Sequence, residues 1–115
     1  MTLINSKVNN KISFLLIYGS PRKNGNTDEL MKKFEAGLLE NKNINCSNLI
    51  IDKVFIRDLK FSACIECRRC SIDGQCALKD EMQDIYPKLI SHDFIAVSSP
   101  VFFTTVSGYL KAFID

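Results

Sequence analysis

The sequence predicts an α/β domain in which a parallel sheet carries helices on both faces. Three short apolar runs that are typical of buried strands alternate with segments of helical periodicity, in the order βαβαβα. Right-handed crossovers join parallel strands of this kind, and a strand order of 2-1-3 is expected. A complete doubly wound sheet has about five strands. The 115 residues are therefore expected to form a single incomplete domain whose later strands are missing.

The first part of the chain predicts one strand and one helix. Residues 12–18 form a nearly continuous apolar run that ends at Gly19, as expected for a central strand buried on both faces. Asn26 is a suitable N-cap with Glu29 three residues later, and apolar residues then follow at helical spacing. A helix from about residue 27 to residue 40 is therefore predicted.

The middle of the chain predicts a second strand, a cysteine-rich loop and a second helix. Residues 49–56 are rich in β-branched and aromatic side chains, which favours a strand. The cysteine-rich loop follows at residues 60–79. The next helix has an apolar face, and Pro87 is expected to bend this helix or end it early. The side chains of that face are Met82, Ile85, Tyr86 and Leu89.

The last part of the chain predicts a third strand and a third helix. Residues 93–99 form an apolar strand closed by Pro100, and Val106, Leu110 and Phe113 have helical spacing. The third strand is expected to leave an apolar edge exposed. Because the helical pattern runs to the last residue without a stop signal, we expect either a truncated domain or a partner chain over that edge.

Composition and charge argue against several classes of function. The net charge of +2 comes from 15 basic and 13 acidic residues, which indicates neither a nucleic-acid nor a membrane partner. Apolar runs stay far below the roughly 20 residues of a membrane helix, and the polar start of the chain does not resemble a signal peptide. A reducing cytoplasm is expected, where clustered cysteines favour metal ligands or redox groups. Cys46 stands alone and is interpreted as a small apolar residue.

A loop suited to an anion follows the first strand. Residues 19–27 are dense in Gly, Ser and Asn and lead into a helix N-terminus, whose free amides and dipole attract phosphate. The loop matches neither the dinucleotide-binding glycine motif nor the Walker A motif, so a mononucleotide phosphate fits better. A plain surface loop has the same composition and stays an alternative. The candidate residues are Ser20, Arg22, Asn24, Gly25, Asn26 and Thr27.

Four cysteines have the spacing C-x2-C-x2-C-x5-C. Three thiolates in so tight a repeat suit three corners of a cubane, and a fourth on a short flexible segment can complete it. Zinc sites more often use two C-x2-C pairs with a longer spacer, so a cluster is favoured over zinc and over unliganded or disulfide-bonded cysteines. The candidate ligands are Cys64, Cys67, Cys70 and Cys76.

A third candidate loop follows the third strand. Its aromatic residues offer walls for a flat ring, although core and turn residues have the same composition. Parallel strands release their following loops at one edge of the sheet, so the anion loop, the cysteine loop and this loop are expected to converge there. The candidate residues are Pro100, Val101, Phe102, Phe103 and Thr104.

Together, these three loops resemble those of the iron-sulfur flavoproteins, which belong to the NADPH-dependent FMN reductase group of the flavodoxin-like superfamily. The resemblance implies a flavodoxin-like parallel sheet, FMN, and a 4Fe-4S cluster on the four spaced cysteines. It also implies a homo-oligomer, since family members are usually dimers or tetramers. The implied FMN contacts are Ser20, Arg22, Asn26 and Thr27 for the phosphate, and Pro100, Val101, Phe102, Phe103 and Thr104 for the ring.

The resemblance implies a redox function in which the cofactors carry the chemistry. We expect an FMN-dependent oxidoreductase or electron-transfer protein that receives electrons from NAD(P)H or a ferredoxin and has no catalytic acid, base or nucleophile. Relatives commonly have Tyr where this chain has Phe102. The single histidine, His92, is expected at the surface or in a helix cap. Two rival hypotheses are a cluster-free NAD(P)H-dependent flavin or quinone reductase, and a non-enzymatic truncated fragment that binds zinc or no cofactor.

Overall fold

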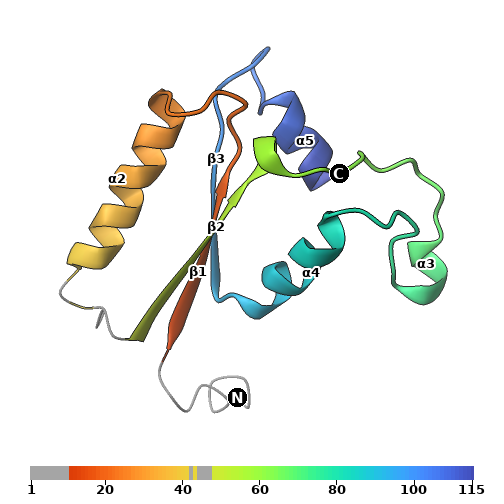
Figure 1. Cartoon of the computed structure of the whole chain (residues 1–115), viewed down its shortest axis with the longest axis horizontal. Helices are drawn as coiled ribbons and strands as arrows, with labels where there is room; N and C mark the ends of the chain where they lie inside the picture. Colours follow the sequence, from red (N-terminus) through yellow and green to blue (C-terminus); the bar gives the residue numbers. More distant parts are fainter. Residues whose placement is uncertain (1–10, 42, 44–47) are drawn as a thin grey trace.

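A computed structural model describes residues 11–41, 43 and 48–115. Three strands, β1 (Ile12–Tyr18), β2 (Leu49–Phe55) and β3 (Phe94–Ser98), form one parallel sheet in the order β2-β1-β3 (Figure 1). The predicted α/β class and the 2-1-3 strand order are therefore confirmed. The expectations for Cys46 and for residues 1–10 lie outside the described residues.

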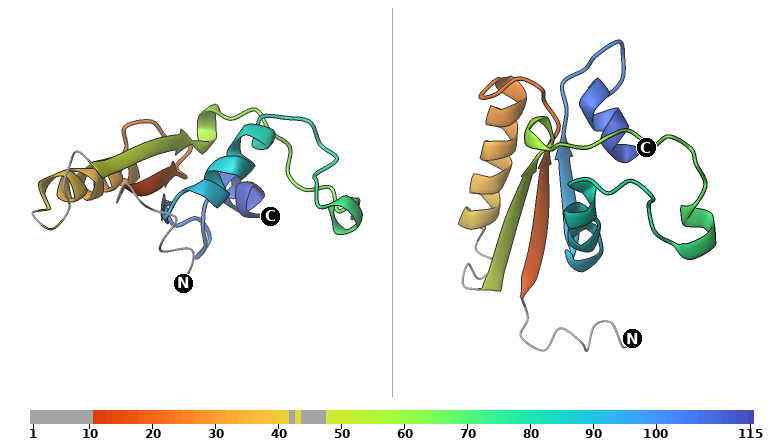
Figure 2. Two further views of the ribbon diagram at one scale, coloured as in Figure 1. Left: turned by 90° about the horizontal axis from the view of Figure 1, so that it is seen from below. Right: turned by 45° about the vertical axis from the view of Figure 1, so that its right-hand side comes forward.

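Helices cover both faces of this sheet, as predicted. The long helix α2 (Asn26–Glu40) lies on one face, and α4 (Met82–Ser91) and α5 (Gly108–Ile114) lie on the other (Figure 1 and Figure 2). A single 3-10 turn, η2 (Ile56–Asp58), follows β2. The predicted cysteine loop contains a short helix, α3 (Cys70–Asp73), so part of that segment is regular.

The register brings the ends of all three strands to one level. Tyr18, the last residue of β1, lies opposite Phe55 on one side and Ser98 on the other. Because the strands are parallel, the loops that follow them leave the same edge of the sheet. In Figure 1 the loops after β1 and β3 lie together at the top, while the segment after β2 turns sideways toward α3.

β1 is the centre of the hydrophobic core. Leu15 and Ile17 pack with apolar residues of α4 and α5 on one face of the sheet. Leu16 and Tyr18 pack with Met31 of α2 on the other face. Side chains alternate across a strand, so a central strand with helices on both sides needs an apolar residue at every position. This requirement explains the apolar run from Phe14 to Tyr18 in the sequence.

The start of α2 differs from the prediction. Gly25 is the N-cap, and Asn26 is the first helical residue. The amide of Glu29 donates to the carbonyl of Gly25 at 3.0 Å, and the carboxylate of Asp28 accepts the amide of Asn24 at 2.9 Å. The Asp28 side chain thereby closes the turn at Asn24, two residues before the expected N-cap Asn26.

Pro87 was expected to bend its helix or to end it early, and the early end is wrong. α4 continues to Ser91 with Pro87 inside it. A proline removes one hydrogen bond from the helix, but the burial of Met82 and Ile85 against the sheet favours the helical conformation on the N-terminal side of it. Packing therefore outweighs the local preference here.

His92 caps the end of α4, which is one of the two roles expected for it. Its Nδ1 lies 2.7 Å from the carbonyl oxygen of Lys88, and its Nε2 lies 2.6 Å from the carboxylate of Asp52 on β2. These contacts hold α4 against the sheet. The histidine therefore has a structural role.

β3 leaves an open apolar edge, as predicted. Within the described residues β3 pairs with β1 alone, and Phe94, Ile95 and Val97 are exposed. The register with β1 places Ile95 and Val97 on the side of α4 and α5 and Phe94 on the side of α2. Nowhere in the described part of the chain is a helix long and apolar enough to cross a membrane.

Candidate cofactor-binding site

Loops from all three strand ends line one pocket. It has a volume of about 470 Å³, and its walls include Pro21 from the loop after β1, Phe61 and Ala63 from the segment after β2, and Phe102 from the loop after β3. The remaining lining residues are Leu59, Gly108, Tyr109 and Ala112. The predicted convergence of three loops on one rim is confirmed.

Gly19 joins the first loop to the third. Its amide donates to the carbonyl of Ser98 at 2.9 Å, and its carbonyl accepts the hydroxyl of Ser107 at 2.6 Å. A Cβ atom on Gly19 would lie only 2.4 Å from the carbonyl oxygen of Ser98. The two backbones therefore approach to a distance that only glycine allows.

The loop after β1 has the properties of an anion site. Within the described residues, no side chain caps the first turn of α2, so the amides there and the positive end of the helix dipole can face a ligand. Arg22, Asn24 and Asn26 are exposed beside this turn, and Thr27 is half-buried. A phosphate group fits this set of amides, guanidinium and short polar side chains.

Ser20 and Gly25 shape the anion loop from inside. Ser20 is buried, and its hydroxyl accepts the amide of Arg22 at 3.1 Å and donates to the Arg22 carbonyl at 3.3 Å. Gly25 is also buried, and a Cβ atom there would lie 3.1 Å from Cδ of Arg22. The two residues thus hold the turn around Arg22. A direct contact between Ser20 and phosphate stays a prediction.

A buried ion pair beneath this loop was not predicted from the sequence. The Asp28 carboxylate lies 3.0 Å from Nη2 and 3.3 Å from Nη1 of Arg57. Arg57 also donates to the carbonyls of Ser20 at 3.1 Å and Arg22 at 3.4 Å. No local pattern links Asp28 to Arg57. Only the pairing of β2 beside β1 brings the turn η2, which contains Arg57, under the loop after β1.

The loop after β3 is a tight hairpin. Phe102 and Thr105 exchange two backbone hydrogen bonds of 2.9 and 3.0 Å, with Phe103 and Thr104 at the turn. The two turn residues have φ of 48° and 60°, the left-handed conformation that a two-residue turn of this kind needs and that Phe and Thr rarely adopt. Phe102 lines the pocket, whereas Phe103 and Val101 project into solvent. Phe102 is thus the predicted ring-binding residue that the structure brings to the pocket wall.

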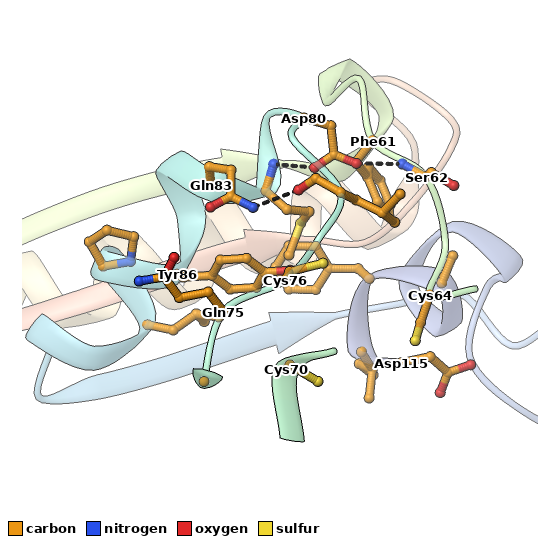
Figure 3. Close-up of a pocket in the computed structure, with 18 of the residues that line it drawn as sticks. Phe61, Ser62, Cys64, Cys70, Gln75, Cys76, Asp80, Gln83, Tyr86 and Asp115 are labelled. Carbon is orange, nitrogen blue, oxygen red and sulfur yellow. Dashed lines mark hydrogen bonds between the residues drawn. The ribbon is translucent and has the colours of Figure 1, made fainter. Parts of the chain in front are cut away.

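Three of the four predicted metal ligands line a second, larger hollow. Cys64, Cys70 and Cys76 border a space of about 910 Å³ that Figure 3 shows together with Tyr86. All four cysteines are free, and Cys67 is exposed outside this lining. In the described part of the chain, no three Cys, His, Asp or Glu side chains gather closely enough to hold a metal ion. The thiols therefore share a hollow without being arranged as ligands.

The cysteine loop bends sharply between its first three cysteines. Glu66 and Arg68 have φ of 56° and 63°, the left-handed conformation that residues other than glycine rarely adopt. The amide of Glu66 donates to Sγ of Cys64 at 3.4 Å. Hydrogen bonds of this kind stabilise thiolate and tune metal centres that use it as a ligand.

Tyr86 was predicted as a core residue of α4 but lies against the cysteine hollow. Burial raises the pKa of its phenol, and a hydrogen bond with Cys76 raises this pKa further. Its spacing from Met82 and Leu89 is that of any core residue, so the sequence gives no signal for the contact. Phe61 and Ala112 line both hollows, which are therefore neighbours.

The comparison with protein families decides what kind of protein this is. The model of the family described as NADPH-dependent FMN reductase matches residues 12–115, which run from β1 through α5. The chain belongs to the NADPH-dependent FMN reductase family. The match includes the anion loop, the cysteine loop and the hairpin. The parallel β2-β1-β3 sheet is the flavodoxin-like arrangement that the resemblance implied for a member of this family.

Curated relatives of this FMN reductase family member carry the name iron-sulfur flavoprotein. Relatives from Archaeoglobus fulgidus, Methanocaldococcus jannaschii and Methanosarcina thermophila are 33%, 31% and 32% identical to it over 99 residues. Each match covers 86% of this chain but only 42%, 48% and 49% of the respective relative. The chain thus spans about half the length of these relatives. No solved structure matches it.

Proposed function

We propose that this FMN reductase family member is an FMN-dependent redox protein that also holds a 4Fe-4S cluster on its cysteine loop. The observation that carries the proposal is the meeting of three loops at one rim, where Pro21, Phe61 and Phe102 face a single pocket. Phe61 also lines the hollow that contains three of the cysteines. A flavin pocket and a thiol-lined hollow with a common wall suit electron transfer between two cofactors.

The residues at the rim fit FMN. The uncapped start of α2 and the exposed guanidinium of Arg22 suit a phosphate, and the mostly apolar pocket beside Phe102 suits a flat ring. Under this proposal the anion loop binds the phosphate and Pro21 and Phe102 keep water from the ring. When bound, FMN exchanges one or two electrons and a 4Fe-4S cluster exchanges one.

The cysteine loop fits the cluster by its donor set. Cys64, Cys67, Cys70 and Cys76 are free thiols, and soft thiolate ligands favour iron-sulfur clusters. The names of the relatives support the same assignment for this chain. Since the thiols are exposed or partly exposed, we also propose a reducing cytoplasm as the compartment. NAD(P)H or a ferredoxin is the proposed electron donor, and a homo-oligomer is the proposed assembly.

An anaerobic reconstitution tests both cofactors. The full chain is incubated with FMN, iron and sulfide, freed of excess reagent, and assayed for bound flavin, iron, sulfide and zinc together with its visible spectrum. We expect bound flavin, and we expect bound iron and sulfide in equal amounts to each other. The double variant Cys64→Ser/Cys70→Ser should lose iron and sulfide and keep FMN, because its anion loop and pocket are unchanged.

Cys46→Ser is the matched control, since Cys46 lies outside the spaced cysteines. It should keep the full iron and sulfide content. Iron retained by the double variant, or zinc bound in place of iron, would contradict the cluster. FMN without iron would support a cluster-free flavin or quinone reductase, and a chain that binds neither cofactor would support the non-enzymatic alternative.

A further inference from the structure

Asp28 places a negative charge next to the proposed phosphate site. It lies in the first turn of α2 and is 1% exposed, and its carboxylate holds the amide of Asn24, whose φ is 57°. A buried carboxylate at this point repels an incoming anion and competes with it for the positive end of the helix. The loop can therefore attract phosphate only if a cation neutralises Asp28.

Arg57 is the cation that neutralises it. Its side chain is 11% exposed, and its guanidinium bonds both oxygens of the Asp28 carboxylate. The same guanidinium binds the carbonyl oxygens of Ser20 and Arg22 and lies 5.1 Å from the centre of the Phe55 ring. Because these carbonyl oxygens accept hydrogen bonds from Arg57, their partial negative charge points away from the proposed phosphate site.

Stability alone does not explain this ion pair. Within the described residues, Nε of Arg57 is buried without a hydrogen-bond partner, which lowers the benefit of the pair. Buried ion pairs also lose hydration, and apolar replacements of both partners are often as stable. What an apolar pair could not do is hold the carbonyls of Ser20 and Arg22 while cancelling the charge of Asp28.

We propose that Arg57 is a positioning residue for the FMN phosphate, acting through Asp28 and the backbone of residues 20–24. The inference rests on the proposed function, because it concerns the phosphate group of bound FMN. It predicts an effect on FMN that is absent for riboflavin, which has the same ring and no phosphate. General damage to the fold would weaken both ligands alike.

The test compares the dissociation constants of FMN and riboflavin for the full chain by flavin fluorescence. Arg57→Gln should weaken FMN binding by about tenfold or more and change riboflavin binding less than about twofold, because it leaves the Asp28 carboxylate without its cation. Arg57→Lys should lose less FMN affinity, since lysine keeps the positive charge but cannot bond the Asp28 carboxylate and both backbone carbonyls at once. Asp28→Asn/Arg57→Gln should recover part of the FMN affinity, and it carries no unpaired buried charge that would prevent folding.

Lys53→Gln is the matched control. Lys53 pairs with Glu35 at 2.9 Å and so also joins β2 to α2, but it does not contact the anion loop. The affinities of the Lys53→Gln variant for FMN and for riboflavin should stay unchanged. Hydrogen exchange of the free chain provides a second measurement: Arg57→Gln should speed exchange of the amides in residues 20–25 and leave β1 protected.

The outcomes separate the two proposals. If the unaltered chain bound FMN no more tightly than riboflavin, the phosphate site itself would be wrong, and the role of Arg57 with it. If the chain preferred FMN and Arg57→Gln kept that preference, only the inference about Arg57 would be wrong, and the proposed phosphate site would stand. Unchanged exchange in residues 20–25 of the variant would also overturn it.

Discussion

Gly19, directly after β1, contacts the end of β3 through the carbonyl of Ser98. The sequence marks it as the end of the first strand, and a turn after it was predicted. Its contact with the Ser98 carbonyl was not predicted, because no local pattern connects two residues so far apart in the chain. Asp28 and Arg57 were missed for the same reason. Single residues that act across strands become visible only when the strand order is known.

Gly19→Ala should destabilise the chain by about 2 kcal/mol or more, because the new methyl group would overlap the Ser98 carbonyl and force β1 and β3 apart. Gly37→Ala is its control, since nothing lies within 4 Å of a Cβ atom at this position in α2. The control should gain about 0.5 to 1 kcal/mol from its higher helix propensity. Urea unfolding measures both changes, and an equal effect of the two substitutions would refute the close approach.

At the scale of elements, the sequence predicted the three strands of the described residues and the helices α2, α4 and α5. It did so because the central strand is apolar at every position but Ser13 and the helices have apolar faces at helical spacing. The errors lie at α2 and α4, where the Asp28 side chain and the packing of Met82 and Ile85 outweigh local signals. The hairpin after β3 was also missed, since Phe103 and Thr104 are unusual residues for its turn.

The double variant Phe103→Asn/Thr104→Gly should therefore be more stable than the unaltered chain, by about 1 to 2 kcal/mol. Both replacements adopt positive φ more readily, and Phe103 is 97% exposed, so little buried surface is lost. Thermal and urea unfolding measure the gain. Val101→Asn, an exposed neighbour in the same loop, should change stability by less than about 0.5 kcal/mol. A double variant no more stable than the unaltered chain would show that the turn is unstrained.

At the scale of the whole molecule, the site was predictable where it depends on topology. Parallel strands release their loops at one edge, so the anion loop, the cysteine loop and the hairpin could be placed together without coordinates. The spacing of Cys64 to Cys76 predicts a set of metal ligands, which stays a prediction. The arrangement of these thiols in space could not be predicted, because the segment holds little regular structure. The pocket walls Leu59, Phe61 and Tyr109 were missed, since apolar residues at such positions resemble core residues.

The open edge of β3 should make the chain associate with itself as its concentration rises. Exposed strand edges pair readily with other strands, and Val97 adds apolar surface there with 50% of its area exposed. Val97→Lys should lower the apparent mass in sedimentation and light scattering. Leu30→Lys is the control, because Leu30 is 68% exposed but lies on α2 away from the edge. Equal effects of both substitutions would indicate nonspecific hydrophobic association and contradict pairing through the edge of β3.

The level ends of the three strands restrict how the length of this chain can change. Inserting one residue within β1 would turn every later side chain of the strand to the opposite face. It would also displace the anion loop by about 3.3 Å along the strand direction relative to the loops after β2 and β3. Insertions in the connecting segments leave this alignment intact. The strands thus act as spacers of fixed length, and variation in length among homologous chains is expected to fall between them.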